Sequence, residues 1–98
     1  MELGIASRSV PAEQVLSVAT DMARDIAVNV APVSAALAKK LMWEGLNVSV
    51  DRMLALESSL LPTLASMPDS GEGVRAFFEK RTPQWRGRVS SDVPDVSL

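Results

Sequence analysis

Apolar residues recur at spacings of three and four along most of the chain, and the first such run predicts a long helix. We place this helix at residues 11–30, with five apolar positions in register: Val15, Ala19, Met22, Ile26 and Val30. Charged residues lie on its other side: Asp21, Arg24 and Asp25. A period near 3.6 residues gathers the apolar side chains on one face. Pro11 suits the first helical position, where its missing N–H costs nothing.

The same period predicts a second and a third helix. The second, at residues 32–46, begins at Pro32 and carries three apolar residues on one face: Val33, Leu37 and Leu41. Ser49 can cap the third helix with its hydroxyl oxygen. The apolar stripe of this helix is Met53, Leu56, Leu60 and Leu64. Pro62 interrupts the stripe, and a proline inside a helix costs roughly 3 kcal/mol. We therefore expect a kink or a break at Pro62.

A fourth helix is predicted between Asp69 and the Thr82–Pro83 pair. Asp69 and Glu72 have the spacing of a capping box, and the apolar residues Val74, Phe77 and Phe78 follow at positions i, i+3 and i+4. Residues 89–98 show no apolar period and are expected to be flexible in solution. Every predicted element with a clear period is helical, so the predicted fold class is all-α, with four helices.

One domain accommodates all 98 residues. We divide it into an extended lead-in at residues 1–10, a helical unit at residues 11–82, and a tail at residues 83–98 that is first basic and then flexible. The lead-in could form a strand, which would find its pairing partner only in another copy of the chain.

Composition narrows the chemistry that the chain can perform. It contains neither cysteine nor histidine, which removes thiol nucleophiles, thiolate metal ligands and the commonest general base. We therefore predict no metal site. The carboxylates Glu44, Glu57 and Glu72 fall on different predicted helices and nothing brings them together, so we predict no catalytic residue among them. The net charge is −2, so we expect no nucleic-acid partner. No stretch approaches the roughly 20 apolar residues that span a bilayer, and residues 1–4 lack the features of a secretory signal. We expect no membrane partner and a cytoplasmic location.

Several short motifs follow one another in a recognisable order. The first motif spans the lead-in and the start of the first helix and reads Leu3-Gly4-Ile5-Ala6-Ser7-Arg8-Ser9-Val10-Pro11-Ala12-Glu13. Lys39 lies in the second predicted helix, and Glu57 lies in the third. Glu72-Gly73, Ala76-Phe77-Phe78-Glu79-Lys80-Arg81, Pro83-Gln84-Trp85 and Gly87-Arg88 complete the order. Over residues 3–88 this series resembles the enoyl-CoA hydratase/isomerase (crotonase) family. Trp85 stands where the family commonly has phenylalanine.

The resemblance implies that the chain corresponds to the C-terminal third of a larger protein. In that family the oxyanion hole and the catalytic carboxylates lie upstream of this region, so the resemblance implies that the chain is inactive alone. It also implies that the helices resemble the helical trimerisation region of the crotonase fold. A homo-oligomer, either a dimer or a trimer, would cover their apolar stripes.

The resemblance further implies two ligand contacts. Phe77 would contact the acyl chain or pantetheine arm of a coenzyme A thioester, and Lys80 would pair with a CoA phosphate. Phe77 could instead be a core residue beside Phe78, and Lys80 could be a solvated cation at the end of a helix. The basic residues Lys80, Arg81, Arg86 and Arg88 surround Trp85; they could hold an anion or form a solvated surface. No other cofactor is expected.

Three functions fit these features. In the first, the chain is an associating C-terminal fragment of an enoyl-CoA hydratase/isomerase-like protein, with lyase or isomerase parentage in fatty acid metabolism. In the second, it is a subunit that completes an acyl-CoA site together with a separate crotonase-type core polypeptide. In the third, it is a free-standing helical binding module unrelated to CoA.

Overall fold

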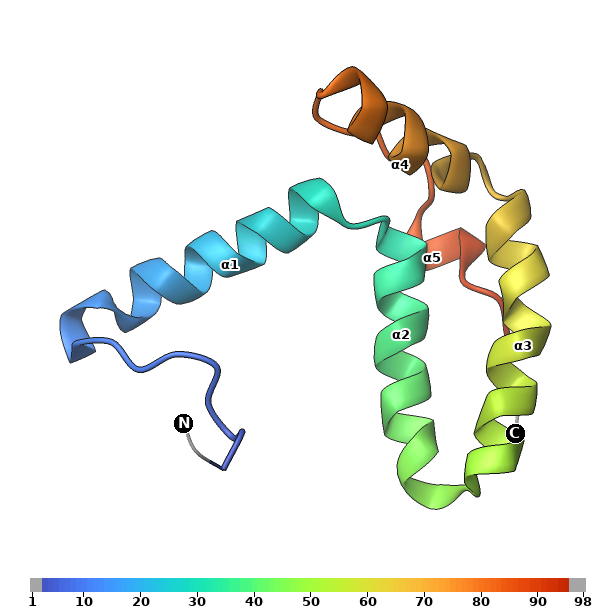
Figure 1. The fold of residues 1–98 in the computed structure, drawn as a ribbon, viewed down its shortest axis with the longest axis horizontal. Coiled ribbons are helices and arrows are strands. Elements are labelled where there is room, and N and C mark those ends of the chain that lie inside the picture. Colours follow the sequence, from blue (N-terminus) through green and yellow to red (C-terminus); the bar gives the residue numbers. More distant parts are fainter. Residues whose placement is uncertain (1–2, 96–98) are drawn as a thin grey trace.

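The computed structural model describes residues 3–95, and these residues form helices and connections without a strand (Figure 1). The predicted all-α class is therefore confirmed. Five α-helices and two turns of 3-10 helix follow in the order Ala12–Gln14, α1 (Val15–Asn29), α2 (Pro32–Glu44), Gly45–Asn47, α3 (Val50–Ser66), α4 (Pro68–Glu79) and α5 (Val89–Asp92). The first two residues of the predicted lead-in and residues 96–98 of the predicted tail lie outside the described residues.

Helices α2 and α3 lie side by side and antiparallel, joined by the 3-10 turn (Figure 1). Their contact forms the core, in which Val33, Leu37 and Leu60 are buried. Further apolar side chains pack around these three: Leu41, Leu56, Leu64, Met67 and Val93. The Ser49 side chain accepts a hydrogen bond of 3.3 Å from the Arg52 N–H at the start of α3. The predicted cap is confirmed, and the stripes of α2 and α3 cover each other.

Helix α3 continues through Pro62 to Ser66, so the break considered at this proline does not occur. Pro62 is exposed and lies four residues before the end of the helix. On either side of it, Leu60 and Leu64 pack into the core against α2. We attribute the continuity to this packing, which offsets the local cost of the proline. A kink at Pro62 stays a prediction.

Helix α1 leaves the hairpin at Ala31 and runs away from it as an arm (Figure 1). None of its residues is buried. The predicted helix at this position forms, but it begins at Val15, after a 3-10 turn that follows Pro11. Large apolar side chains remain exposed along α1, including Val15, Leu16, Met22 and Ile26.

Helix α4 lies across the end of the α2–α3 hairpin, and the chain then returns alongside it to α5 (Figure 1). We call residues 81–88 the return segment. Helix α5 lies within the region predicted as tail, and Val93 behind it packs against the core. The flexibility of the tail stays a prediction. Between residues 3 and 95, no helix is both long and apolar enough to cross a membrane.

Candidate functional site

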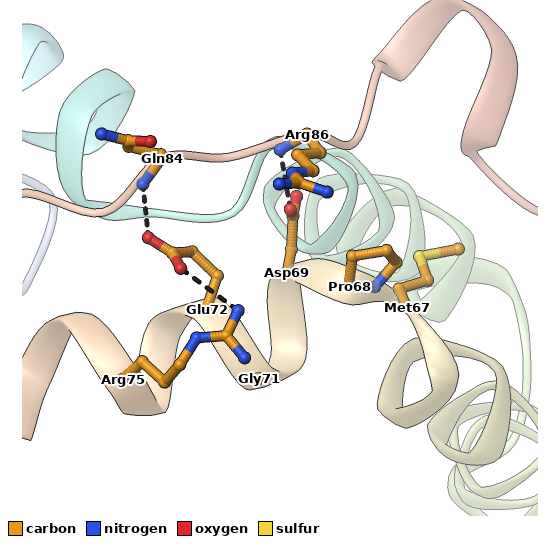
Figure 2. Close-up of a pocket in the computed structure, with 8 residues that line it drawn as sticks. All are labelled: Met67, Pro68, Asp69, Gly71, Glu72, Arg75, Gln84 and Arg86. Atoms are coloured by element: carbon orange, nitrogen blue, oxygen red, sulfur yellow. Dashed lines mark hydrogen bonds and ion pairs between the residues drawn. The ribbon is translucent and has the colours of Figure 1, made fainter.

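Two carboxylates on α4 are buried although they are charged, with residue exposures of 7% for Asp69 and 8% for Glu72. Buried carboxylates need hydrogen-bond partners, and for Asp69 these are backbone groups of the return segment. Its Oδ1 accepts a hydrogen bond from the Arg86 N–H at 2.7 Å, and its Oδ2 accepts one from the Gly87 N–H at 3.0 Å. Figure 2 shows the contact between Asp69 and Arg86.

Glu72 holds the same segment one turn further along α4. Its Oε1 accepts a hydrogen bond from the Gln84 N–H at 2.8 Å, and Arg75 donates to its Oε2 at 3.3 Å (Figure 2). Arg81 pairs with both carboxylate oxygens of Glu72 and also with Glu79. The Arg81 guanidinium, followed by the Gln84 N–H, lowers the pKa of Glu72 from 4.5 to about 2. The two carboxylates raise the pKa of Arg81 above its already high value.

The predicted capping box at Asp69 and Glu72 is therefore wrong. Helix α4 starts at Pro68, with Met67 at the capping position, and no side chain bonds the free N–H groups of its first turn. Pro68 at the first helical position brings the start of the helix two residues earlier than a box capped by Asp69 requires. Asp69 and Glu72 then share a face, three residues apart, that is directed at the return segment.

Gly87 allows the return segment to lie close to α4 and to the core. A Cβ atom at Gly87 would lie 2.8 Å from Asp69 Oδ2 and 2.9 Å from Val33 Cγ2, so no side chain fits there. At Gly73, a Cβ atom would stand 3.5 Å from the Trp85 ring, which is ordinary contact. The indole of Trp85 therefore lies over α4 at Gly73, and the backbone at Gly87 reaches the core at Val33.

Trp85 also connects the return segment to the α1 arm. Its Nε1–H donates a hydrogen bond of 2.9 Å to the backbone oxygen of Val28, in the last turn of α1. This bond uses the N–H of the indole, so the part of the ring that is left for other contacts is apolar.

An open hollow of about 600 Å³ lies between α4, the return segment and the end of α1, and its walls include Phe77, Phe78, Lys80, Pro83 and Trp85. The structure thus brings both predicted ligand residues, Phe77 and Lys80, to one hollow. Phe77 and Phe78 are 78% and 77% exposed and meet edge to face, with ring centroids 5.7 Å apart. Neither ring is a core residue in residues 3–95, contrary to the alternative reading of Phe77.

Lys80 ends α4 in a left-handed conformation with φ of 51°. Its N–H bonds to the Phe77 oxygen at 3.3 Å, and the Arg81 N–H bonds to the Ala76 oxygen at 3.1 Å. These two hydrogen bonds satisfy the last carbonyl oxygens of the helix in a way that is common at helix ends, although glycine is the usual residue in this left-handed position. The chain therefore turns sharply at Lys80, which leaves this side chain at the edge of the hollow.

The hydrogen bonds of Asp69 and the wall formed by Trp85 were not recognised in the sequence. Their signal was the order of residues: two carboxylates three apart on a helix, followed by a proline, an aromatic residue and a glycine at fixed distances. The carboxylates Glu44 and Glu57 take no part in the hollow. Within the described ranges, no group of acidic side chains is arranged to hold a metal ion.

The fold and this site define an all-helical unit in which α4 and the return segment frame an aromatic hollow with a lysine at its edge. The model of the enoyl-CoA hydratase/isomerase family matches residues 1–88. The chain belongs to this family, as the order of its motifs predicted.

Individual relatives agree with this assignment. An enoyl-CoA hydratase of Alternaria alternata is 39% identical over 84 residues, which are 85% of this chain and 28% of that protein. The 2,3-dehydroadipyl-CoA hydratase of Escherichia coli (strain K12) is 32% identical over 87 residues, 89% of this chain and 34% of that protein. The crystal structure of a probable enoyl-CoA hydratase/isomerase from Mycobacterium abscessus matches with a TM-score of 0.83 and 44% identity, over 89% of this chain and 35% of that one. The chain spans about a third of the length of these relatives.

Proposed function

We propose that the chain acts as the C-terminal third of an enoyl-CoA hydratase/isomerase-like protein, with an associating role and no catalysis of its own. Its helices would correspond to the trimerisation region of the crotonase fold. Two observations support the proposal: the order of the motifs over residues 3–88, and the share of about a third that the chain covers in its relatives.

The observation that carries the proposal is the exposed apolar surface of α1. Its side chains are amphipathically arranged, yet Leu16 is 78% exposed and Ile26 is 54% exposed. A stripe of this kind on a helix that buries no residue marks a surface for association. A second copy of the chain, as a dimer or a trimer, would cover it. We assign the chain a cytoplasmic location as part of the same proposal.

Light scattering of the purified chain over a range of concentrations tests this role. The expected result is a defined dimer or trimer whose mass falls on dilution. A variant with Leu16→Lys and Ile26→Lys should be monomeric, because each lysine places a charge on the apolar stripe. The matched control, Lys39→Glu on α2, changes charge outside α1 and should leave the mass unchanged. A folded monomer at all concentrations contradicts self-association.

A second function is favoured by one specific observation: Phe77 and Lys80 share a hollow. In this alternative the chain is a subunit that completes an acyl-CoA site with a separate polypeptide bearing the crotonase-type core. Phe77 would supply an exposed aromatic surface to the acyl or pantetheine portion. The Lys80 ammonium would pair with a phosphate, a charge-assisted contact.

Co-expression with such a core polypeptide tests the second function. Hydration of crotonyl-CoA should appear only when both polypeptides are present, and Phe77→Ala and Lys80→Ala should each raise KM about tenfold. Lys39→Ala, which removes a lysine from α2 outside the hollow, is the matched control. A stable complex that shows no activity would contradict this second function, but it would not contradict the proposed associating role.

A further inference from the structure

Trp85 is the aromatic residue of the hollow whose position the structure determines most closely. Its two neighbours in the chain, Gln84 and Arg86, each donate a backbone hydrogen bond to a buried carboxylate, at 2.8 Å to Glu72 and 2.7 Å to Asp69. Backbone anchors on both sides leave the residue between them little freedom to move away from α4. Phe77 and Phe78, by contrast, project from α4 with more than three quarters of their surface exposed.

The orientation of the indole is also determined. Its only polar atom, Nε1, donates to the Val28 oxygen at 2.9 Å, and one part of its ring lies against Gly73, where a Cβ would stand 3.5 Å away. The ring surface that remains faces the hollow beside Phe77, Pro83 and Lys80.

Together these residues offer a ligand two kinds of contact. Phe77, Pro83 and Trp85 provide apolar and aromatic surface, and Lys80 provides a cation at the edge. Arg81 is engaged by Glu72 and Glu79, so its charge is already compensated. The hollow therefore suits a ligand with an apolar portion and an anionic portion. This is the chemistry of a coenzyme A thioester.

We infer that Trp85 is a third ligand contact of this hollow, which meets the apolar portion of a CoA thioester with the face of its indole. The inference rests on the second proposed function, because it takes its ligand class from that site. It adds a residue whose side chain is held in place before the ligand arrives. A contact that needs no ordering on binding retains more of its interaction energy as affinity.

The test uses the emission of Trp85 in the full chain. The other tryptophan, Trp43, is replaced by Trp43→Phe, which is a mild change at a residue that is 66% exposed on α2. The chain is then titrated with butyryl-CoA, a saturated thioester, and binding is measured independently by calorimetry. The expected result is a change in Trp85 emission with the same half-saturation as the heat signal.

Two variants at position 85 separate the ring from its hydrogen bond. Trp85→Leu removes the aromatic face and should weaken butyryl-CoA binding about tenfold. Trp85→Phe keeps an aromatic face and removes only the donor to Val28, so its affinity should stay within about threefold of the parent. Circular dichroism checks that each variant folds, and if Trp85→Leu does not fold, the emission titration of the Trp43→Phe chain decides.

Binding by calorimetry with unchanged Trp85 emission, and with equal affinity for Trp85→Leu, overturns the inference but leaves the CoA site standing. Absence of binding by the parent chain up to millimolar butyryl-CoA overturns the inference, because the hollow of this chain then does not hold the thioester. The co-expression assay tests the second proposed function separately.

Discussion

Helix α1 and the α2–α3 hairpin have similar sequence patterns but different surroundings. Both carry apolar residues at helical spacing, yet the hairpin buries Leu37 to 1% exposure and α1 buries no residue. The stripes of α2 and α3 face each other across one short turn, whereas α1 projects away from the hairpin (Figure 1). The comparison shows that an amphipathic pattern indicates that a helix has an apolar face to bury, but it does not identify what that face packs against.

The largest expected effect comes from truncating the centre of the hairpin. Leu37→Ala should lower the free energy of unfolding by about 2–5 kcal/mol, because it leaves a cavity in a small core. The corresponding change in α1, Ile26→Ala, should stay within about 0.5 kcal/mol when the chain is monomeric.

Thermal unfolding followed by circular dichroism, at a concentration where light scattering finds monomer, measures both changes. If Leu37→Ala and Ile26→Ala lowered the free energy of unfolding equally, the contrast between the hairpin and α1 would be wrong, since α1 would then contribute to the same core.

The next effect concerns the anchors that join α4 to the return segment. Asp69→Ala leaves the Arg86 and Gly87 N–H groups without their acceptor and should cost about 3 kcal/mol. Amide hydrogen exchange should accelerate at residues 84–87 more than in α1. Asp51→Ala, which removes an exposed carboxylate at the start of α3, is the matched control. Unchanged exchange at Arg86 and Gly87 would show that Asp69 does not hold them.

Acid should loosen the return segment before it unfolds the hairpin. Arg81, and then the Gln84 N–H, lower the pKa of Glu72 to about 2. A carboxyl with a lowered pKa stabilises the folded state fully above its ordinary pKa of 4.5, and this contribution disappears as the pH falls toward 2. The Arg88 N–H and Ser91 lower the pKa of Asp92 too, so it acts in the same direction.

The emission of Trp85 in the Trp43→Phe chain, recorded from pH 6 to pH 2, reports this step. Glu72→Gln should remove the part of the transition that belongs to Glu72, while Glu57→Gln on α3 serves as the control. Identical acid transitions for the parent and Glu72→Gln would assign the step to other groups.

The smallest effect tests the hydrogen bond that joins α1 to the rest of the chain. Trp85→Phe removes the donor to the Val28 oxygen and should cost about 0.5–1.5 kcal/mol. Amide exchange should accelerate in the last turn of α1 and stay unchanged in α2, with Trp43→Phe as the control. If exchange in α1 does not respond, the arm is held by other contacts.

Much of this fold could be predicted from local patterns. The four runs at spacings of three and four became α1 to α4, and Ser49 caps α3 as its position before the stripe indicated. These features depend on residues within one or two turns of each other, which the sequence displays directly. Of the two outcomes expected at Pro62, a kink or a break, the break does not occur, because α3 packs against α2 on both sides of the proline.

The candidate site was predicted only in part. Phe77 and Lys80 were chosen through a resemblance, and the structure places both on one hollow with Trp85. The bonds from Asp69 to Arg86 and Gly87 join residues 17 and 18 positions apart. Asp69 and Glu72 could be taken for a capping box because an acceptor side chain three residues before a glutamate near the start of a helix fits both a box and a pair of long-range anchors.

The sequence by itself determined the helices, the family and the charge pattern of this chain, because each is a property of near neighbours or of an ordered series of motifs. Only the tertiary structure decided that Asp69 and Glu72 hold the return segment, that Trp85 forms a wall beside Phe77, and that α1 leaves its stripe uncovered. The physical reason is that a side chain's partners are set by where the backbone folds back, and the energy of burying a charge or an apolar face depends on those partners.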